Sequence, residues 1–169
     1  MSSVFVTDER EGAGLDLLRW SRLARFVLAQ ERVPADAQLS VIFVDEQAIT
    51  DLNARFLEGD GPTDVLAFPI DDDIPPPGRQ PDGGGRGPGS PDEPGEPPAV
   101  LGDVVLCPAV AARQAVEHGR ALDDELALLV VHGVLHLLDY DHAEDAEGAV
   151  MRRREQELLN GFRAASREP

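Results

Sequence analysis

The sequence predicts an α+β fold, in which a small mixed β-sheet is covered by a layer of helices. Short apolar runs rich in β-branched residues are interspersed with longer segments whose apolar residues recur at helical spacing. These segments do not follow a regular strand–helix alternation, and no internal repeat is visible. One helical segment is apolar nearly all round but too short to cross a membrane, so it is expected to be a central buried helix.

The first part of the chain contains three expected strands and two expected helices. Nearly continuous apolar runs predict strands at residues 4–6, 39–44 and 63–68. Residues 15–30 form a helix in this interpretation, because their large apolar side chains recur on or near one face. A second helix follows Asp45, whose carboxylate can cap it. Gly59-Asp60-Gly61-Pro62 predicts the turn that leads into the third strand.

Residues 71–98 differ from the rest, because they are dense in Pro, Gly, Asp and Glu and almost without large apolar residues. Such a segment cannot bury enough surface to offset the entropy of ordering it, so we predict disorder. We interpret it as an insertion between two paired strands of one domain that spans residues 1–169.

The remaining elements follow that insertion. A strand is expected at 100–106, with Gly102 as a candidate bulge, and helices are expected at 108–118, 126–138 and 144–162. Asp123 or Asp124 can cap the helix that contains residues 126–138.

The composition limits the functions that the chain can have. The formal net charge is −17 at pH 7, which opposes non-specific binding of nucleic acid but leaves room for a local basic surface. Arg19, Arg22 and Arg25 recur on one side of the first helix, and we interpret them as a solvated face rather than a phosphate-binding one. Cys107 is the only cysteine, and no secretory signal is evident. A soluble cytoplasmic protein without membrane contact is therefore expected.

Three of the four histidines lie close together, at relative positions 0, 4 and 10: His132, His136 and His142. On a helix, His132 and His136 project from the same face, and His142 follows after the helix ends. Two imidazoles on a helix and a third from the next turn suit a tetrahedral metal that keeps one position for water. The alternative is that these are core or capping histidines.

This spacing resembles that of metzincin-type metalloproteases. The helix must then end soon after His136, and the turn needs a residue that tolerates positive φ, a place that Asp139 holds here. In helical zinc peptidases a glutamate after the first histidine is the general base, whereas this chain has Gly133. The motif predicts a zinc hydrolase or a structural zinc site, and it argues against a protease.

The segment HGVLHLLDYDH also resembles the signature of the YbeY family of bacterial endoribonucleases, H-G-x-L-H-L-x-G-Y-D-H. Further blocks resemble the family in the same order along the chain: residues 41–46 with Leu52-Asn53, residues 61–69, residues 101–107, and Met151 and Glu155 in the last helix. Many members carry an arginine before the second of these blocks, and direct alignment places Leu57 there.

The resemblance implies a mixed sheet with a helical layer and one zinc ion held by His132, His136 and His142. It implies RNA as substrate, in particular the 3′ end of small-subunit rRNA, together with a role in the quality control of defective ribosomes. The implied partners are the small ribosomal subunit and its proteins.

The mechanism expected for such a site is metal-assisted phosphodiester hydrolysis. Asp141, beside the third ligand, and Asp64, at the start of a strand, are candidates for proton transfer. Asp141 could instead cap a loop, and Asp64 could instead fix the turn after Pro62. Two other functions stay open. The zinc could be structural in a non-catalytic ribosome-assembly factor, or the protein could be a metallopeptidase whose base comes from elsewhere in the chain.

Overall fold

The computed structural model describes residues 2–12, 14–70, 100–140 and 145–167. In chain order its elements are β1 (Ser3–Asp8), α1 (Leu17–Gln30), β2 (Gln38–Phe43), α2 (Glu46–Leu57), β3 (Val65–Pro69), β4 (Val100–Leu106), α3 (Pro108–His118), α4 (Leu122–Leu137) and α5 (Asp145–Arg167). The predicted α+β class is confirmed. Among the described residues, none of the helices combines the length and the apolar character that a membrane span requires.

The strands form one mixed sheet in the order β1-β2-β4-β3. β2 runs parallel to β1 and to β4, whereas β3 is antiparallel to β4, with Val65 opposite Leu106 and Pro69 opposite Gly102. The strands that flank residues 71–98 are therefore neighbours. The predicted disorder of that segment lies outside the described residues and stays a prediction.

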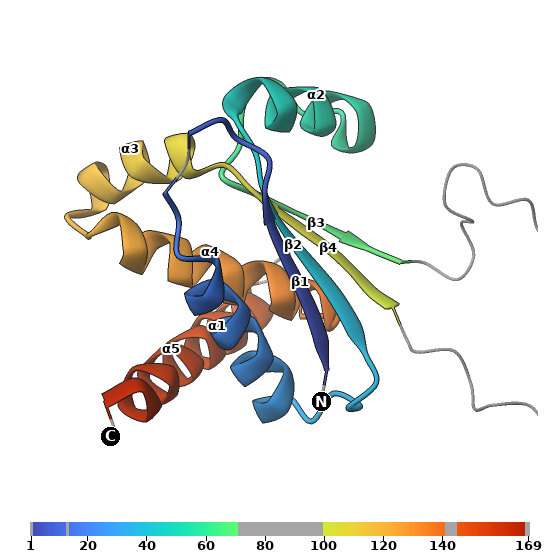
Figure 1. Cartoon of the computed structure of the whole chain (residues 1–169), viewed down its shortest axis with the longest axis vertical. Coiled ribbons are helices and arrows are strands. Elements are labelled where there is room, and N and C mark those ends of the chain that lie inside the picture. Colours follow the sequence, from blue (N-terminus) through green and yellow to red (C-terminus); the bar gives the residue numbers. More distant parts are fainter. Residues whose placement is uncertain (1, 13, 71–99, 141–144, 168–169) are drawn as a thin grey trace, which may run out of the picture.

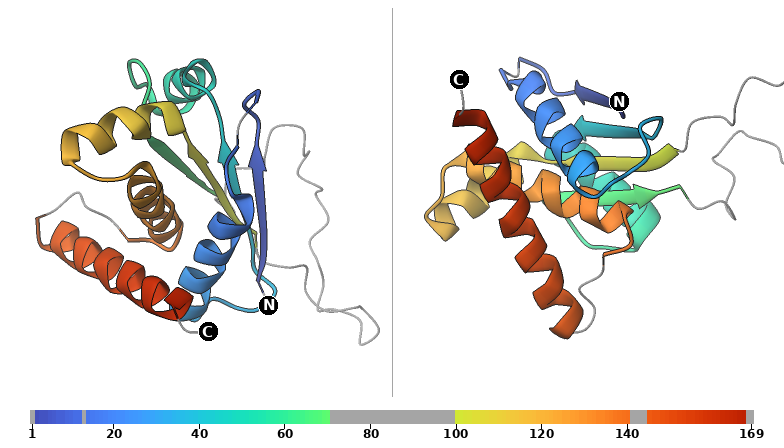
Figure 2. Two further views of the ribbon diagram at one scale, coloured as in Figure 1. Left: turned by 60° about the vertical axis from the view of Figure 1, so that its left-hand side comes forward. Right: turned by 90° about the horizontal axis from the view of Figure 1, so that it is seen from below.

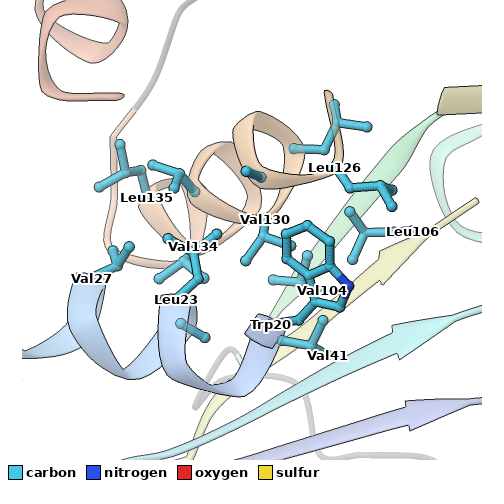
Figure 3. Close-up of a cluster of buried hydrophobic side chains, with 14 of the residues drawn as sticks. Trp20, Leu23, Val27, Val41, Val104, Leu106, Leu126, Val130, Val134 and Leu135 are labelled. Carbon is cyan, nitrogen blue, oxygen red and sulfur yellow. The ribbon is translucent and has the colours of Figure 1, made fainter. Parts of the chain in front are cut away.

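Helices α1, α4 and α5 gather on one side of the sheet, and α2 lies near one end of it (Figures 1 and 2). The main core forms between α1, α4 and the strands, and Figure 3 shows its central side chains. Val104 and Leu106 of β4 point into this core, while Val105 between them joins a smaller cluster with Ile49 of α2. This is the period-two alternation of a sheet that is covered on both faces.

A bulge interrupts the pairing of β2 with β4. Gln38 pairs with Val100 and Leu39 with Gly102, so Leu101 is the extra residue. Gly102 has φ of 139°, and a Cβ there would lie 2.2 Å from the carbonyl oxygen of Phe68. The bulge predicted at Gly102 is confirmed, and the close approach of β3 explains why a glycine is needed.

The structure confirms the predicted N-cap of α2 but not that of α4. The Asp45 carboxylate accepts a hydrogen bond from the backbone N–H of Ala48 at 2.8 Å, as predicted for α2. The predicted cap of α4 by Asp123 or Asp124 is wrong, because Ala121 is the N-cap and both aspartates lie in the first turn. Carboxylates in the first turn still stabilise α4, since they face the positive end of the helix dipole.

Candidate metal centre and cleft

Two histidines of α4 lie side by side at a surface cleft. The ring centroids of His132 and His136 are 4.7 Å apart, and the ring planes meet at 78°. The rings share one helix face because the residues are one turn apart. The cleft has a volume of about 410 Å³ and lies between α4 and β3, with Asp64 and Leu57 also in its lining.

A buried carboxylate on α5 fixes the first of these imidazoles. Oε1 of Glu155 lies 2.6 Å from Nδ1 of His132, and the Glu155 side chain is only 7% exposed. A carboxylate oxygen accepts in such a contact, so Nδ1–H of the ring is the donor. A carboxylate that holds the second nitrogen of a histidine is the usual support of a metal-binding imidazole.

The sequence pattern places Glu155 within the last helix but does not reveal its contact with His132. The sequence around Glu155 does, however, indicate that its side chain is buried. Glu155 occupies the buried face of α5, between Met151 and the pair Leu158 and Leu159. A lone carboxylate among apolar positions must find a polar partner in the core, because a buried unpaired charge is costly.

Gly133, between the two histidines, is a point of close contact between α4 and the sheet. A Cβ on Gly133 would lie 2.5 Å from Cγ1 of Val104, a side chain that is itself fully buried. The general-base glutamate of helical zinc peptidases therefore has no room at this position. This packing explains the glycine at position 133, and it leaves open a metallopeptidase whose base comes from elsewhere in the chain.

The turn after α4 has the conformation that the histidine spacing requires. Asp139 has φ of 71°, in the left-handed region, as the sequence predicted for this place. The N–H of Asp139 donates to the carbonyl of His136 at 3.2 Å, and the N–H of Tyr140 donates to that of Leu135 at 3.1 Å. These two bonds form a Schellman motif, which turns the chain back beside the second histidine.

Two of the predicted site residues, His142 and Asp141, lie outside the described residues, so their roles stay predictions. Within the described ranges, no group of three or more His, Cys, Asp or Glu side chains is placed to hold a metal ion. His132 and His136 are thus the described members of the predicted ligand set. The fourth histidine, His118, lies apart on α3, where its Nδ1 is 3.3 Å from Oε1 of Glu125.

A polar contact anchors the same turn to α1 and α5. The hydroxyl of Tyr140 donates to Oε2 of Glu31 at 2.9 Å, and Nε of Arg154 donates to Oε1 of the same carboxylate. Burial and, after it, the Glu31 carboxylate raise the pKa of Tyr140 above its usual range. Tyr140 therefore stays a neutral donor and ties the end of α4 to two other helices.

Asp64 lies at the cleft and also fixes a turn, while its part in proton transfer stays a prediction. It lines the cleft, and its Oδ1 accepts hydrogen bonds from the Val65 N–H at 2.8 Å and from the Thr63 hydroxyl at 3.2 Å. Its carboxylate therefore fixes the turn into β3 beside the cleft. Leu57 lines the same cleft, whereas the guanidinium of Arg55 lies 5.4 Å from the ring centroid of Phe56.

These features define a class of protein: a small mixed-sheet α+β protein with paired imidazoles at a cleft between its central helix and a strand. The sequence matches the family described as Endoribonuclease YbeY over residues 6–163. The chain belongs to this family of endoribonucleases.

Curated relatives are similar in sequence over nearly the full length of the chain. The Endoribonuclease YbeY of Thermobifida fusca is 45% identical over 98% of this chain and 97% of that relative. That of Kineococcus radiotolerans is 44% identical over 99% of this chain and 90% of the relative. The solution structure of TM1509 from Thermotoga maritima has a TM-score of 0.55 and 24% identity, covers 98% of this chain and 93% of its own, and shows the same fold.

Proposed function

We propose that this protein is a zinc-dependent endoribonuclease for single-stranded RNA that matures the 3′ end of small-subunit rRNA and takes part in ribosome quality control. The observation that carries the proposal is the pair His132 and His136 at a cleft, with one ring oriented by the buried carboxylate of Glu155. Membership of an endoribonuclease family supports an RNA substrate. The expected partners are the small ribosomal subunit and its proteins.

The residues present suit a zinc ion in their chemistry. Imidazole nitrogen is a preferred zinc ligand, and the Nδ1 proton held by Glu155 directs Nε2 of His132 toward such a role. We assign His132, His136 and His142 as the ligands of one zinc ion. When bound, zinc acts as a Lewis acid on a phosphoryl oxygen and makes water a stronger nucleophile.

The other residues of the site have separate tasks. Asp64 lines the cleft, where its carboxylate can accept a proton from the attacking group, and Asp141 is the second candidate for this step. The cleft volume of about 410 Å³ falls within the range of small-molecule sites, so it can hold one nucleotide unit of a strand. We place the reaction in the cytoplasm, which suits a chain whose one cysteine, Cys107, is buried and unpaired.

One observation favours a second candidate function, a non-catalytic ribosome-assembly factor in which zinc is structural. Leu57 lines the cleft at the position where the family resemblance leads us to expect an arginine. An apolar side chain there offers no charge to a scissile phosphate. For the endoribonuclease, by contrast, the positive charge that meets the phosphate must come from arginines elsewhere on the surface.

Cleavage of an rRNA 3′-end precursor by the purified protein separates the two functions. We expect shortening of the RNA that a chelator stops and that His132→Ala abolishes, while His118→Ala, at the histidine outside the cleft, cleaves as the wild type does. Equal cleavage by His132→Ala would mean a contaminating nuclease. Stoichiometric zinc without cleavage of precursor, free or within the small subunit, would favour the assembly factor.

A further inference from the structure

Residues from the start of α1 and the end of α5 line a second groove, of about 370 Å³. Four arginines line it, Arg19 and Arg22 from α1 and Arg163 and Arg167 from α5, together with Asp16 and Phe162. The ring of Phe162 packs against Phe26 of α1 with centroids 5.7 Å apart, so the two helices are fixed beside each other. The groove shares no lining residue with the histidine cleft.

The charge of this groove contrasts with that of the whole chain. The sequence has 15 basic and 32 acidic residues, yet four arginines line this groove with Asp16, and two further carboxylates, Asp123 and Asp124, reach them only through ion pairs. Asp16 is occupied as the cap of α1, since its Oδ1 accepts the backbone N–H of Arg19 at 3.2 Å. The groove is therefore a local positive surface on an acidic protein, as a site for a polyanion would be.

The ion pairs of these arginines are weak. Arg19 lies 3.8 Å from Asp123 and Arg163 lies 3.3 Å from Asp124, and all four side chains are more than 40% exposed. Exposed pairs of this kind contribute little and exchange readily with other anions. Among the described residues, neither Arg22 nor Arg167 makes an ion pair, so their guanidinium groups remain open to a ligand.

We propose that this groove binds the phosphate backbone of single-stranded RNA, at a distance from the site of cleavage. Each guanidinium offers a planar fork that fits a phosphate, and several in one groove can hold successive phosphates of a strand. The half-buried ring of Phe162 adds a surface on which a base can stack. The proposal rests on the proposed function, since it concerns a second contact of the same substrate.

The position of the groove along α5 determines how long an RNA must be to reach from the histidine cleft to the groove. Arg163 and Arg167 follow Glu155, which contacts His132, by 8 and 12 residues. At about 1.5 Å per residue these arginines lie roughly 12 and 18 Å further along the helix. A stacked strand advances about 3.4 Å per nucleotide, so a stacked strand needs about four nucleotides to span the shorter of these distances.

The sequence alone favoured a solvated face for the arginines of α1. That interpretation rested on a single helix with three arginines on its surface. The tertiary structure adds two more from the other end of the chain and leaves Arg25 out of the groove.

The double variant Arg22→Ala with Arg167→Ala tests the proposal, measured by fluorescence anisotropy with a labelled single-stranded RNA of about 20 nucleotides over a range of KCl concentrations. We expect the Kd at low salt to rise roughly tenfold and the slope of log Kd against log salt to fall by about 1.4, because each lost phosphate contact removes about 0.7. Arg152→Ala with Arg153→Ala, two exposed arginines on the same helix outside the groove, is the matched control.

The control pair should leave the slope near that of the wild type. Equal losses in both double variants would overturn the proposal, since they would show a general effect of charge. Unchanged RNA binding by the groove variant would also overturn it, and if association with the ribosomal subunit were lost at the same time, the groove would be a protein-binding surface. Unfolding curves check that all variants remain folded.

Cleavage assays with a short and a long RNA distinguish a failure of this proposal from a failure of the proposed function. The groove variant should cleave an oligonucleotide too short to reach the groove as the wild type does, and should show a raised KM on a long one. If the wild type cleaves neither RNA, the proposed function fails, while the anisotropy experiment still decides whether the groove binds RNA.

Discussion

Glu155 and His132 form the most informative contact of the molecule, with 2.6 Å between Oε1 and Nδ1. The two residues come from different helices, α5 and α4, and are 23 positions apart. One buried carboxylate thereby selects the protonated ring nitrogen and holds the ring at the cleft. The last helix is thus part of the site as well as of the core.

Replacing this carboxylate while keeping its size should weaken metal binding. For Glu155→Gln we expect a loss of about 10- to 100-fold in zinc affinity, because the amide cannot raise the basicity of the imidazole as a carboxylate does. Competition with a chromophoric chelator measures the affinity. The exposed Glu157→Gln on the same helix is the control and should bind zinc as the wild type does.

Filling the space at Gly133 should destabilise the fold. Alanine is the better helix former by about 1 kcal/mol, but the added methyl group meets Val104 at 2.5 Å. Since overpacking of this kind costs about 1–3 kcal/mol, we expect Gly133→Ala to lower the free energy of unfolding in urea by about 1 kcal/mol. In combination with Val104→Ala the loss should be smaller than the two single losses added together. Strict additivity would show that the contact is not the cause.

The left-handed residue after α4 allows a gain in stability. Asp139 has φ of 71°, which costs a side-chain-bearing residue about 1 kcal/mol and glycine almost nothing. Asp139→Gly should therefore raise the free energy of unfolding by roughly 0.5–1 kcal/mol, and Asp139→Val should lower it. Glu58→Gly, at the C-cap of α2 with φ of 52°, should give a similar gain away from the site. A loss of stability in both glycine variants would contradict this explanation.

The contributions of two aspartates, Asp103 and Asp8, to the free energy of unfolding should change with pH in opposite directions. Burial raises the pKa of Asp103, and a hydrogen bond from Ser40 on the neighbouring strand lowers it in part. The stability that comes from protonated Asp103 is complete below the unfolded value of about 3.9 and is lost as pH rises through the higher folded-state pKa. Asp103→Asn should therefore be more stable than the wild type at neutral pH, and the difference should vanish in acid.

Asp8 is the counterpart, because the guanidinium of Arg10 lowers its pKa through a hydrogen bond. Its stabilisation is present above the unfolded value and is lost as pH falls through the folded-state pKa. Asp8→Asn should accordingly be less stable than the wild type at neutral pH and equal to it in strong acid. Urea unfolding at about pH 2 and about pH 7 measures both variants. The same sign for both would contradict the assigned environments.

The sequence predicted those parts of the site that depend on local geometry. The helical spacing of His132 and His136 and the positive φ of Asp139 follow from a few neighbouring residues, and the structure has both. The contact of Glu155 with His132 joins two helices, so no local pattern reveals its partner. The sequence does not predict the N-cap of α4 correctly, because aspartate is favoured both at the N-cap and in the first turn that follows it.

The metal content of the purified protein tests the central proposal most directly. Elemental analysis should find about one zinc ion per chain in the wild type and in His118→Ala, and little or none in His136→Ala. A His136→Ala protein that is folded and retains the full zinc content would contradict the assignment of the site.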